Sequence, residues 1–181
     1  AKTRIPLAVI HRLDQPVSGI LVFAKTPAAA KELNRQLTTS GFGKHYYALV
    51  AGTPEQPSAD LENYLVKDAR TNTSRVCQGT ADAKLAKLHY DLVDTTFFAD
   101  IASAIPVATS QLKIKLDTGR HHQIRVQLSG MGCPIIGDTK YNPDSPKLTA
   151  RRTPLCLCAY QLEFRHPVTK KAMTFSLEHY I

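Results

Sequence analysis

Residues 11–25 read HRLDQPVSGILVFAK, a turn-forming segment that runs directly into a row of apolar residues. The composition of residues 20–25 predicts a buried strand, and the proline and glycine before it predict a turn. This order holds the carboxylate of Asp14 at an edge of the predicted sheet, where a substrate can reach it. Taken alone, an Asp before a proline-containing turn is explained equally well by hydrogen bonding within the turn.

The rest of the chain carries more strand patterns than helix patterns. Thr26 and Pro27 form a helix start, and helices are predicted over residues 28–37 and 121–131. Strands are predicted over residues 44–50, 84–93, 111–116, 155–164 and 172–177, with a hairpin or loop at 68–80. Residues 94–110 have no clear pattern, and residues 142–154, which contain proline and arginine, are predicted to form an excursion. The irregular order predicts an α+β domain with a mixed, largely antiparallel sheet flanked by helices and loops.

The charge balance is strongly basic. Twenty-three Lys and Arg residues against fifteen Asp and Glu residues give a net charge of +8 and a pI of about 9.4. This excess favours a nucleic-acid partner, because neutralising phosphates releases their counterions. In residues 111–116, Lys113 and Lys115 alternate with apolar side chains, so one face of this strand is basic, and we expect that face to contact the nucleic acid.

Membrane and metal functions find no support in the sequence. No apolar run approaches the roughly 18 residues that span a bilayer, and no signal-peptide pattern opens the chain. The composition therefore predicts a soluble, cytoplasmic protein. The cysteines lack CxxC spacing, and no ligand pattern accompanies the pair His121 and His122, so structural thiols are predicted in place of a metal site. The four cysteines are Cys77, Cys133, Cys156 and Cys158.

Three segments combine groups that could act on a nucleic acid. Residues 11–14 hold a His, an Arg and Asp14; residues 44–50 hold a lysine and a tyrosine pair; residues 118–125 form a glycine turn that leads into a basic helix start. A nearby arginine could keep Asp14 ionised, a tyrosine offers a flat surface for a nucleobase, and the helix start could hold phosphate. Each segment also has a structural explanation, such as a core tyrosine or solvated helix charges.

Together, the three segments resemble the motifs of the RluA-type pseudouridine synthases. His11–Asp14 with Ser18–Gly19 resembles the catalytic motif, and Lys44-x-Tyr46 looks like the tyrosine strand of that family. Residues 116–138, with Gly119–Arg120 and His122–Arg125, are similar to the third motif. The closing strand, with Ala159, Leu162, Phe164 and His166–Pro167, also follows the family.

The resemblance implies the pseudouridine synthase fold and the isomerisation of uridine in ribosomal or transfer RNA to pseudouridine. It implies no cofactor and no metal. Asp14 would be the catalytic carboxylate, as nucleophile or as base, with Arg125 as its ion-pair partner. Tyr46 would pack on the uracil and assist proton removal from its fifth carbon. The substrate-binding residues would be Arg12, which fills the gap left by the flipped uridine, together with His11, Arg120 and Ile124, the last as an apolar wall.

The chain departs from the family pattern in a few places. Val17 and His121 each replace a Thr, and only ten residues precede His11, where relatives carry an earlier strand with an Asn-Lys-Pro-type element. We therefore expect residues 1–181 to form a single catalytic domain that lacks its N-terminal strand region and acts as a monomer. Two alternatives stay open: an RNA-binding protein that keeps the scaffold without catalysis, and a nucleoside hydrolase, which usually needs two carboxylates.

Overall fold

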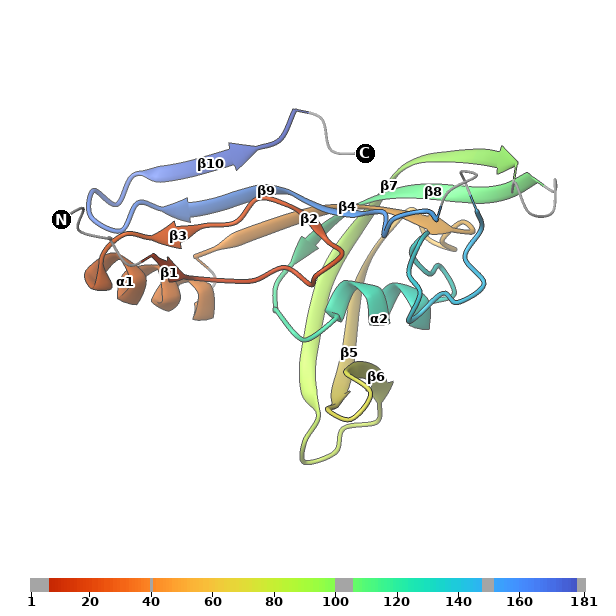
Figure 1. Ribbon diagram of the computed structural model, residues 1–181, viewed down its shortest axis with the longest axis horizontal. Helices are drawn as coiled ribbons and strands as arrows, with labels where there is room; N and C mark the ends of the chain where they lie inside the picture. The colour runs from red at the N-terminus through yellow and green to blue at the C-terminus, as the bar shows by residue number, and fades with distance from the viewer. Residues whose placement is uncertain (1–6, 40, 100–105, 148–151, 179–181) are drawn as a thin grey trace.

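One large sheet joins strands from both ends of the chain (Figure 1). The computed structural model describes residues 7–39, 41–99, 106–147 and 152–178. Within these ranges the main sheet has eight strands, in the order β10-β9-β4-β8-β7-β5-β6, with β2 added alongside β9. All pairs are antiparallel except β2 with β9. The predicted α+β class with a mixed, largely antiparallel sheet is confirmed.

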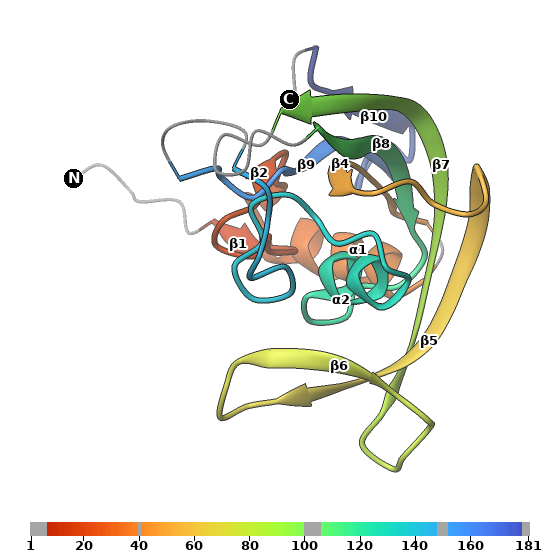
Figure 2. The same ribbon diagram turned by 90° about the vertical axis from the view of Figure 1, so that its right-hand side faces the viewer.

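Two helices lie on the same side of this sheet, and a separate pair of short strands lies near the N-terminus (Figures 1 and 2). No helix in the described ranges is long and apolar enough to cross a bilayer. The elements are β1 (Ala8–Val9), β2 (Ser18–Gly19), β3 (Phe23–Ala24), α1 (Pro27–Thr38), β4 (Gly43–Ala51), β5 (Ser58–Asp68), β6 (Thr73–Cys77), β7 (Lys84–Ala99), β8 (Pro106–Leu116), α2 (Gln123–Gly130), β9 (Leu157–Arg165) and β10 (Ala172–Ser176).

Helix α1 begins where the sequence predicts it. The hydroxyl of Thr26 accepts a hydrogen bond from the backbone N–H of Ala29 at 3.2 Å, and Pro27 occupies the first turn, where its missing N–H costs nothing. Leu33 is buried and packs in a cluster with Phe42 and Phe164. The helix therefore covers one end of the sheet.

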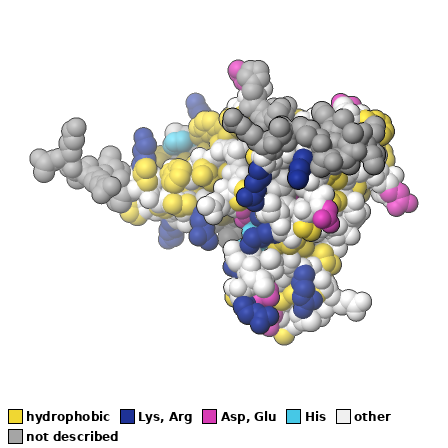
Figure 3. Space-filling model, turned by 45° about the vertical axis from the view of Figure 1, so that its right-hand side comes forward, with side chains coloured by type: hydrophobic (Ala, Val, Ile, Leu, Met, Phe, Trp, Pro, Cys, Tyr) yellow, Lys and Arg dark blue, Asp and Glu magenta, His cyan; other side chains and the backbone are white. Residues whose placement is uncertain are grey.

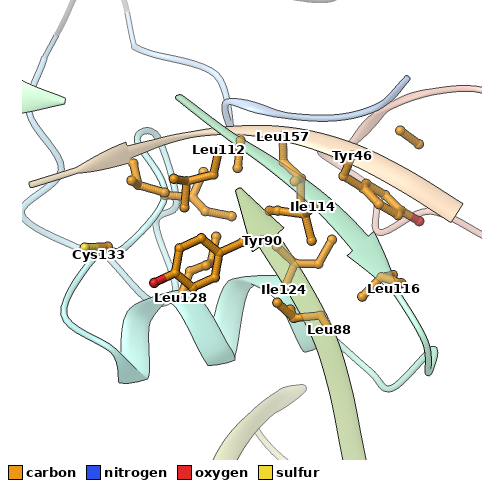
Figure 4. Close-up of a cluster of buried hydrophobic side chains, with 14 of the residues drawn as sticks. Tyr46, Leu88, Tyr90, Leu112, Ile114, Leu116, Ile124, Leu128, Cys133 and Leu157 are labelled. Carbon is orange, nitrogen blue, oxygen red and sulfur yellow. The ribbon is translucent and has the colours of Figure 1, made fainter. Parts of the chain in front are cut away.

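Helix α2 covers the other end of the sheet and closes the main core (Figure 4). Ile124 and Leu128 are buried against side chains of β4, β7 and β8, including Ile114 and Leu112. The predicted apolar stripe of this helix is therefore confirmed at these two positions, while Met131 caps the helix and is only partly buried. Removal of this apolar surface from water contributes about 25 cal/mol per Å² to stability.

The prediction of a buried strand over residues 20–25 is wrong in most of its length. Only Phe23 and Ala24 pair with a neighbour, the short strand β1. Leu21 is 39% exposed and Phe23 is 45% exposed, because only alternate side chains turn toward α1. Residues 20–25 therefore lie at the edge of the fold and bury the side chains of only one side.

Strands β7 and β8 are longer than predicted. They form a hairpin whose paired residues run from Leu88 and Leu116 to Ala99 and Pro106, and the register shifts between Leu92 and Asp94. This hairpin accounts for most of residues 94–110; residues 100–105 lie outside the described ranges.

The far ends of β5, β6 and β7 curl away from the sheet and form an arm beneath the helices (Figure 2). The predicted hairpin at residues 68–80 is part of this arm, with β5 and β6 paired from Tyr64 and Cys77 to Asp68 and Thr73. The predicted excursion over residues 142–154 is irregular where it is described, and residues 148–151 lie outside those ranges.

Candidate active site

Asp14 lies on a turn that is fastened to the C-terminal part of the sheet. The backbone N–H of Val17 donates to the carbonyl of Asp14 at 2.9 Å, which closes the turn. The next two residues form β2, in which Gly19 pairs with Ala159 of β9. Gly19 has φ +132°, and a Cβ at this position would overlap the carbonyl oxygen of Ala159. The turn therefore requires a glycine here, and it leaves the Asp14 side chain 31% exposed.

Strand β4 delivers Tyr46 to the site. Alternate residues of this strand face the core, so Tyr46 is 7% exposed while Tyr47 lies on the opposite face against Tyr160. Figure 4 shows Tyr46 at the edge of the main core. Burial, together with the negative charge of Asp14, raises the pKa of Tyr46 to about 12. The phenol is therefore protonated at neutral pH.

The turn before α2 is organised by the buried side chain of Gln123. Its amide oxygen accepts hydrogen bonds from the Thr118 hydroxyl at 2.7 Å and from the Arg120 backbone N–H at 2.9 Å. Its amide nitrogen donates to the carbonyl of Lys87 at 3.0 Å. These three bonds tie the basic turn to β7 and fix the direction in which Arg120 leaves the backbone.

Arg125 is buried between two carboxylates. It donates two hydrogen bonds of 2.7 Å to Asp138, and its Nη1 atom lies 3.7 Å from Oδ2 of Asp14. Burial acts to lower the pKa of Arg125, but the bonds and charge of Asp138 raise it overall. The predicted ion pair with Asp14 is present, yet Asp138 is the closer partner. The sequence motif contained Asp138 without indicating this role, because the residue follows the helix in a loop.

A histidine that sequence reasoning did not assign to the site also faces Asp14. His122 caps α2 in the left-handed conformation, with φ 52°, and its Nε2 atom lies 3.8 Å from Oδ2 of Asp14. Its Nδ1 atom shares a hydrogen bond of 2.8 Å with the Tyr141 hydroxyl. Burial is the largest cause that lowers the pKa of His122 to about 4, so the imidazole is neutral at pH 7. The sequence signals for His122 were its place in the third motif and the pair of adjacent histidines, and neither indicated that it faces Asp14.

His121 and Tyr141 connect this wall of the site to the arm. The hydroxyl of Tyr141 accepts from the backbone N–H of Ser74, and Nδ1 of His121 shares a bond with the Ser74 hydroxyl, both at 2.8 Å. The rings of His121 and His122 stack at 3.8 Å. A continuous set of contacts therefore runs from β6 to Asp14.

The predicted site residues meet around two adjoining hollows. A cleft of about 800 Å³ is lined by five of them, and a smaller hollow of about 60 Å³ is lined by Arg125 and Ile124. Asp14 and Tyr46 line both hollows. The five residues of the cleft are His11, Arg12, Asp14, Tyr46 and Arg120. The structure thus brings all seven predicted residues together, although Ile124 is almost fully buried.

The basic strand face does not belong to this site. Lys113 and Lys115 pair with Tyr47 and His45 across β4 and β8, so they lie on the face of the sheet opposite to Tyr46. The structure therefore separates these lysines from the predicted site residues, and their contact with RNA stays a prediction. On the face shown in Figure 3, Lys and Arg side chains instead run down the middle and gather on the arm below.

The described residues contain no group of three or more His, Cys, Asp or Glu side chains arranged to hold a metal ion. All four cysteines are free thiols.

Comparison with known proteins decides the family. A family model described as RNA pseudouridylate synthase matches residues 2–130. The chain belongs to this family. The match contains Asp14, Tyr46 and Arg125, whereas Asp138 and Tyr141 lie beyond it.

Individual RNA pseudouridine synthases match over most of the chain. The dual-specificity RNA pseudouridine synthases RluA of Pasteurella multocida (strain Pm70) and Escherichia coli (strain K12) are 34% and 35% identical over 167 residues. Each alignment covers 92% of this chain and 70% of the relative. The predicted membership of an RluA-type family of isomerases is confirmed.

Solved structures confirm the pseudouridine synthase fold. Human RNA Pseudouridylate Synthase Domain Containing 1 is similar with a TM-score of 0.77 at 24% identity, over 96% of this chain and 69% of that chain. Human RNA Pseudouridylate Synthase Domain Containing 4 gives a TM-score of 0.75 at 24% identity, over 96% and 71%.

Proposed function

We propose that this chain isomerises uridine in RNA to pseudouridine, with Asp14 as the catalytic carboxylate. The reaction breaks the N-glycosidic bond, turns the uracil while it is held, and joins its fifth carbon to the ribose. The proton on that carbon is lost to solvent, and the ring nitrogen released from the ribose takes up a proton in its place. The observation that carries the proposal is the position of Asp14, which is partly exposed to the cleft and flanked by the buried Arg125 at 3.7 Å and by Tyr46.

Arg125 would keep Asp14 charged inside the cleft. A guanidinium close to a carboxylate favours its ionised form, and Asp138 fixes the guanidinium through two bonds of 2.7 Å. The ionised Asp14 serves either of two roles: attack on the nucleoside, or removal of the proton from the ribose carbon next to the anomeric carbon.

Tyr46 would provide the surface on which the uracil turns. Its ring lines both hollows beside Asp14, and stacking of a base on an aromatic ring contributes about 1–3 kcal/mol. Since its pKa is raised to about 12, the phenol of Tyr46 is protonated before the reaction begins. If it takes the proton from the fifth carbon, its own proton must leave in the same step.

The remaining residues would hold the RNA around the flipped uridine. Arg12 is exposed at the mouth of the cleft, where its planar guanidinium can stack in the gap that the uridine leaves. Ile124 closes the small hollow as an apolar wall. Arg120 and His11 line the cleft together with Lys44 and complete the substrate-binding set.

We further propose ribosomal or transfer RNA as the substrate, the cytoplasm as the compartment, and a monomer as the active form. The cytoplasm is supported by the four free thiols, since reducing compartments preserve them. Comparing pseudouridine maps of RNA from cells with and without the gene identifies the target uridine, and light scattering gives the oligomeric state.

The catalytic role is tested by Asp14→Asn, with Asp82→Asn on the exposed surface as the matched control. We expect Asp14→Asn to lower tritium release from RNA labelled at the fifth carbon of uracil by roughly 10²–10⁴-fold or more, with RNA binding retained. Asp82→Asn should release tritium at the wild-type rate.

Three results would contradict the proposed function. Turnover of Asp14→Asn within tenfold of wild type would remove Asp14 from the chemistry. Wild-type binding without tritium release would favour the non-catalytic scaffold. Appearance of free uracil would favour a nucleoside hydrolase.

A further inference from the structure

We propose that Lys44 and Arg120 form a phosphate-binding subsite for the RNA backbone in the cleft beside the uracil site. This inference rests on the proposed function, because it takes RNA as the ligand. It concerns a pair of cations on the wall of the cleft, and neither is needed to explain the chemistry at Asp14.

Lys44 is a buried cation on the wall of the cleft. The residue is only 8% exposed, yet it lines the cleft. Among the residues that the structure describes, its ammonium has no hydrogen bond or ion pair. Burial lowers the pKa of Lys44, the charge of Arg120 lowers it further, and Asp117 acts in the opposite direction. A buried ammonium in this state is strongly disfavoured until an anion joins it.

The fold holds Lys44 in this position through its backbone. Lys44 pairs with Leu116 across β4 and β8, and the chain then turns at Gly119. A Cβ at Gly119 would lie 3.1 Å from the Lys44 Nζ atom, so the ammonium lies directly against this turn. A glycine leaves room for the lysine and for a ligand above it.

Arg120 supplies the second cation from the same turn. Its Nε atom donates to the carbonyl of Leu85 at 2.8 Å, which fixes the side chain. Within the described part of the chain, its two terminal nitrogens have no hydrogen-bond partner. They are therefore available to a ligand, and a guanidinium fork suits two oxygens of a phosphate.

The charge of the cleft selects an anion. Its lining carries four cationic side chains, Arg12, Lys44, Lys67 and Arg120, against the carboxylates of Asp14 and Asp117. Uracil is neutral, so the anion that RNA brings to this cleft is a backbone phosphate. Lys44 and Tyr46 lie on one face of β4, about 7 Å apart along the strand. A nucleotide whose base lies on Tyr46 therefore directs one of its flanking phosphates toward Lys44.

The first test measures RNA binding in the Asp14→Asn background, so that turnover plays no part. The probe is a labelled RNA stem-loop containing the uridine that the wild-type chain converts, followed by fluorescence anisotropy. We expect Lys44→Met to weaken binding about tenfold near 0.1 M salt and to reduce the slope of log K against log salt by about 0.7 to 0.9. Lys44→Arg should retain most of the affinity. Lys31→Met, the same change at an exposed position of α1 that lines neither hollow, should alter binding by less than about twofold.

The second test locates the phosphate. Each phosphate flanking the target uridine is replaced in turn by a neutral methylphosphonate. One replacement should weaken binding to the Lys44 protein and have no effect on Lys44→Met, and its position tells whether the contacted phosphate lies 5′ or 3′ of the uridine. An equal loss for every RNA in both proteins would overturn the subsite.

Thermal unfolding without RNA separates binding from folding. Since Met removes an unpaired buried charge, Lys44→Met should raise the Tm of the free protein. A lower Tm together with an unchanged salt slope would make Lys44 a structural residue and overturn the inference. If the Lys44 protein neither binds the RNA nor releases tritium, the proposed function itself fails; if it does both without dependence on Lys44, only the subsite fails.

Discussion

At the scale of single residues, the site depends on how one buried arginine is shared. Arg125 is 4% exposed, and its strong bonds go to Asp138, while Asp14 lies a full ångström farther away. Asp138 also accepts the backbone N–H groups of Lys140 and Tyr141 at 2.9 and 3.1 Å. Asp138 therefore orients Arg125, and the arginine in turn lies beside Asp14. The carboxylate of Asp14 stays free to react.

We expect Asp138→Ala to lower the free energy of unfolding by about 3–5 kcal/mol, because it leaves a guanidinium buried without its partner. Turnover should fall as well, because Arg125 loses the two hydrogen bonds that orient its guanidinium toward Asp14. The double variant Asp138→Ala with Arg125→Met should recover part of the stability but none of the turnover. Urea unfolding gives the first quantity and tritium release the second. A loss below about 1 kcal/mol in the single variant would show that Arg125 does not need Asp138.

The sequence predicts roles for the motif residues that the family uses directly. It does not predict which other residues the fold places in contact with them. Asp14, Tyr46 and Arg125 stand in three recognisable segments, and the structure places all three around the small hollow. His122 and Asp138 stand in the same motif, but nothing in their spacing says that they face Asp14 and Arg125. Such contacts depend on a left-handed helix cap and on the path of a loop, which periodicity does not describe.

At the scale of secondary-structure elements, local patterns succeeded where the environment is regular. Helix α1 has its cap and proline in the sequence, and β8 alternates between core and solvent. The pattern is misleading at residues 20–25, where an apolar run predicts a buried strand but the segment buries only one of its sides. The parallel contact of β2 with β9 could not be predicted, because two residues carry no periodicity.

We expect Gly19→Ala to lower the free energy of unfolding by about 2–4 kcal/mol. The positive φ of this position is unfavourable for alanine, and the new Cβ would overlap the carbonyl oxygen of Ala159. We therefore expect β2 to separate from β9 and the Asp14 turn to be displaced. Gly130→Ala is the matched control: its Cβ would lie 3.5 Å from Val76, an ordinary contact, and alanine favours the helix by up to about 1 kcal/mol. Equal effects of the two changes on thermal unfolding would contradict this account of β2.

At the scale of the whole molecule, charge and burial together set the response to acid. Burial lowers the pKa of four of the described histidines, His11, His45, His121 and His122, whereas hydrogen bonding to Asp60 raises that of His89. The four buried histidines have lowered pKa values only while the protein is folded, because unfolding exposes them to water. The composition predicted a basic protein, but it could not say which histidines are neutral, because burial follows from the fold.

Stability should therefore fall on acidification from pH 6.5 toward pH 4, the ordinary and folded pKa values of His122. In this window the unfolded chain binds a proton that the folded chain does not, so the free energy of unfolding rises with pH. The contribution of His122 is at most about 3 kcal/mol. His122→Asn, which suits the left-handed backbone, should flatten the pH dependence of urea unfolding. Parallel curves for the two proteins would show that His122 is not the responsible group.

The parallel pairing of Ser18 with Cys158 has a consequence for how the protein is made. The Asp14 turn is synthesised well before the strand β9 that holds it in place, because Ser18 and Cys158 lie far apart in the sequence. Contacts between such distant segments slow folding, because a long loop must close before they form. During translation the growing chain therefore carries the Asp14 motif for some time before the turn has its β-strand partner. We expect the site to assemble only after β9 has left the ribosome.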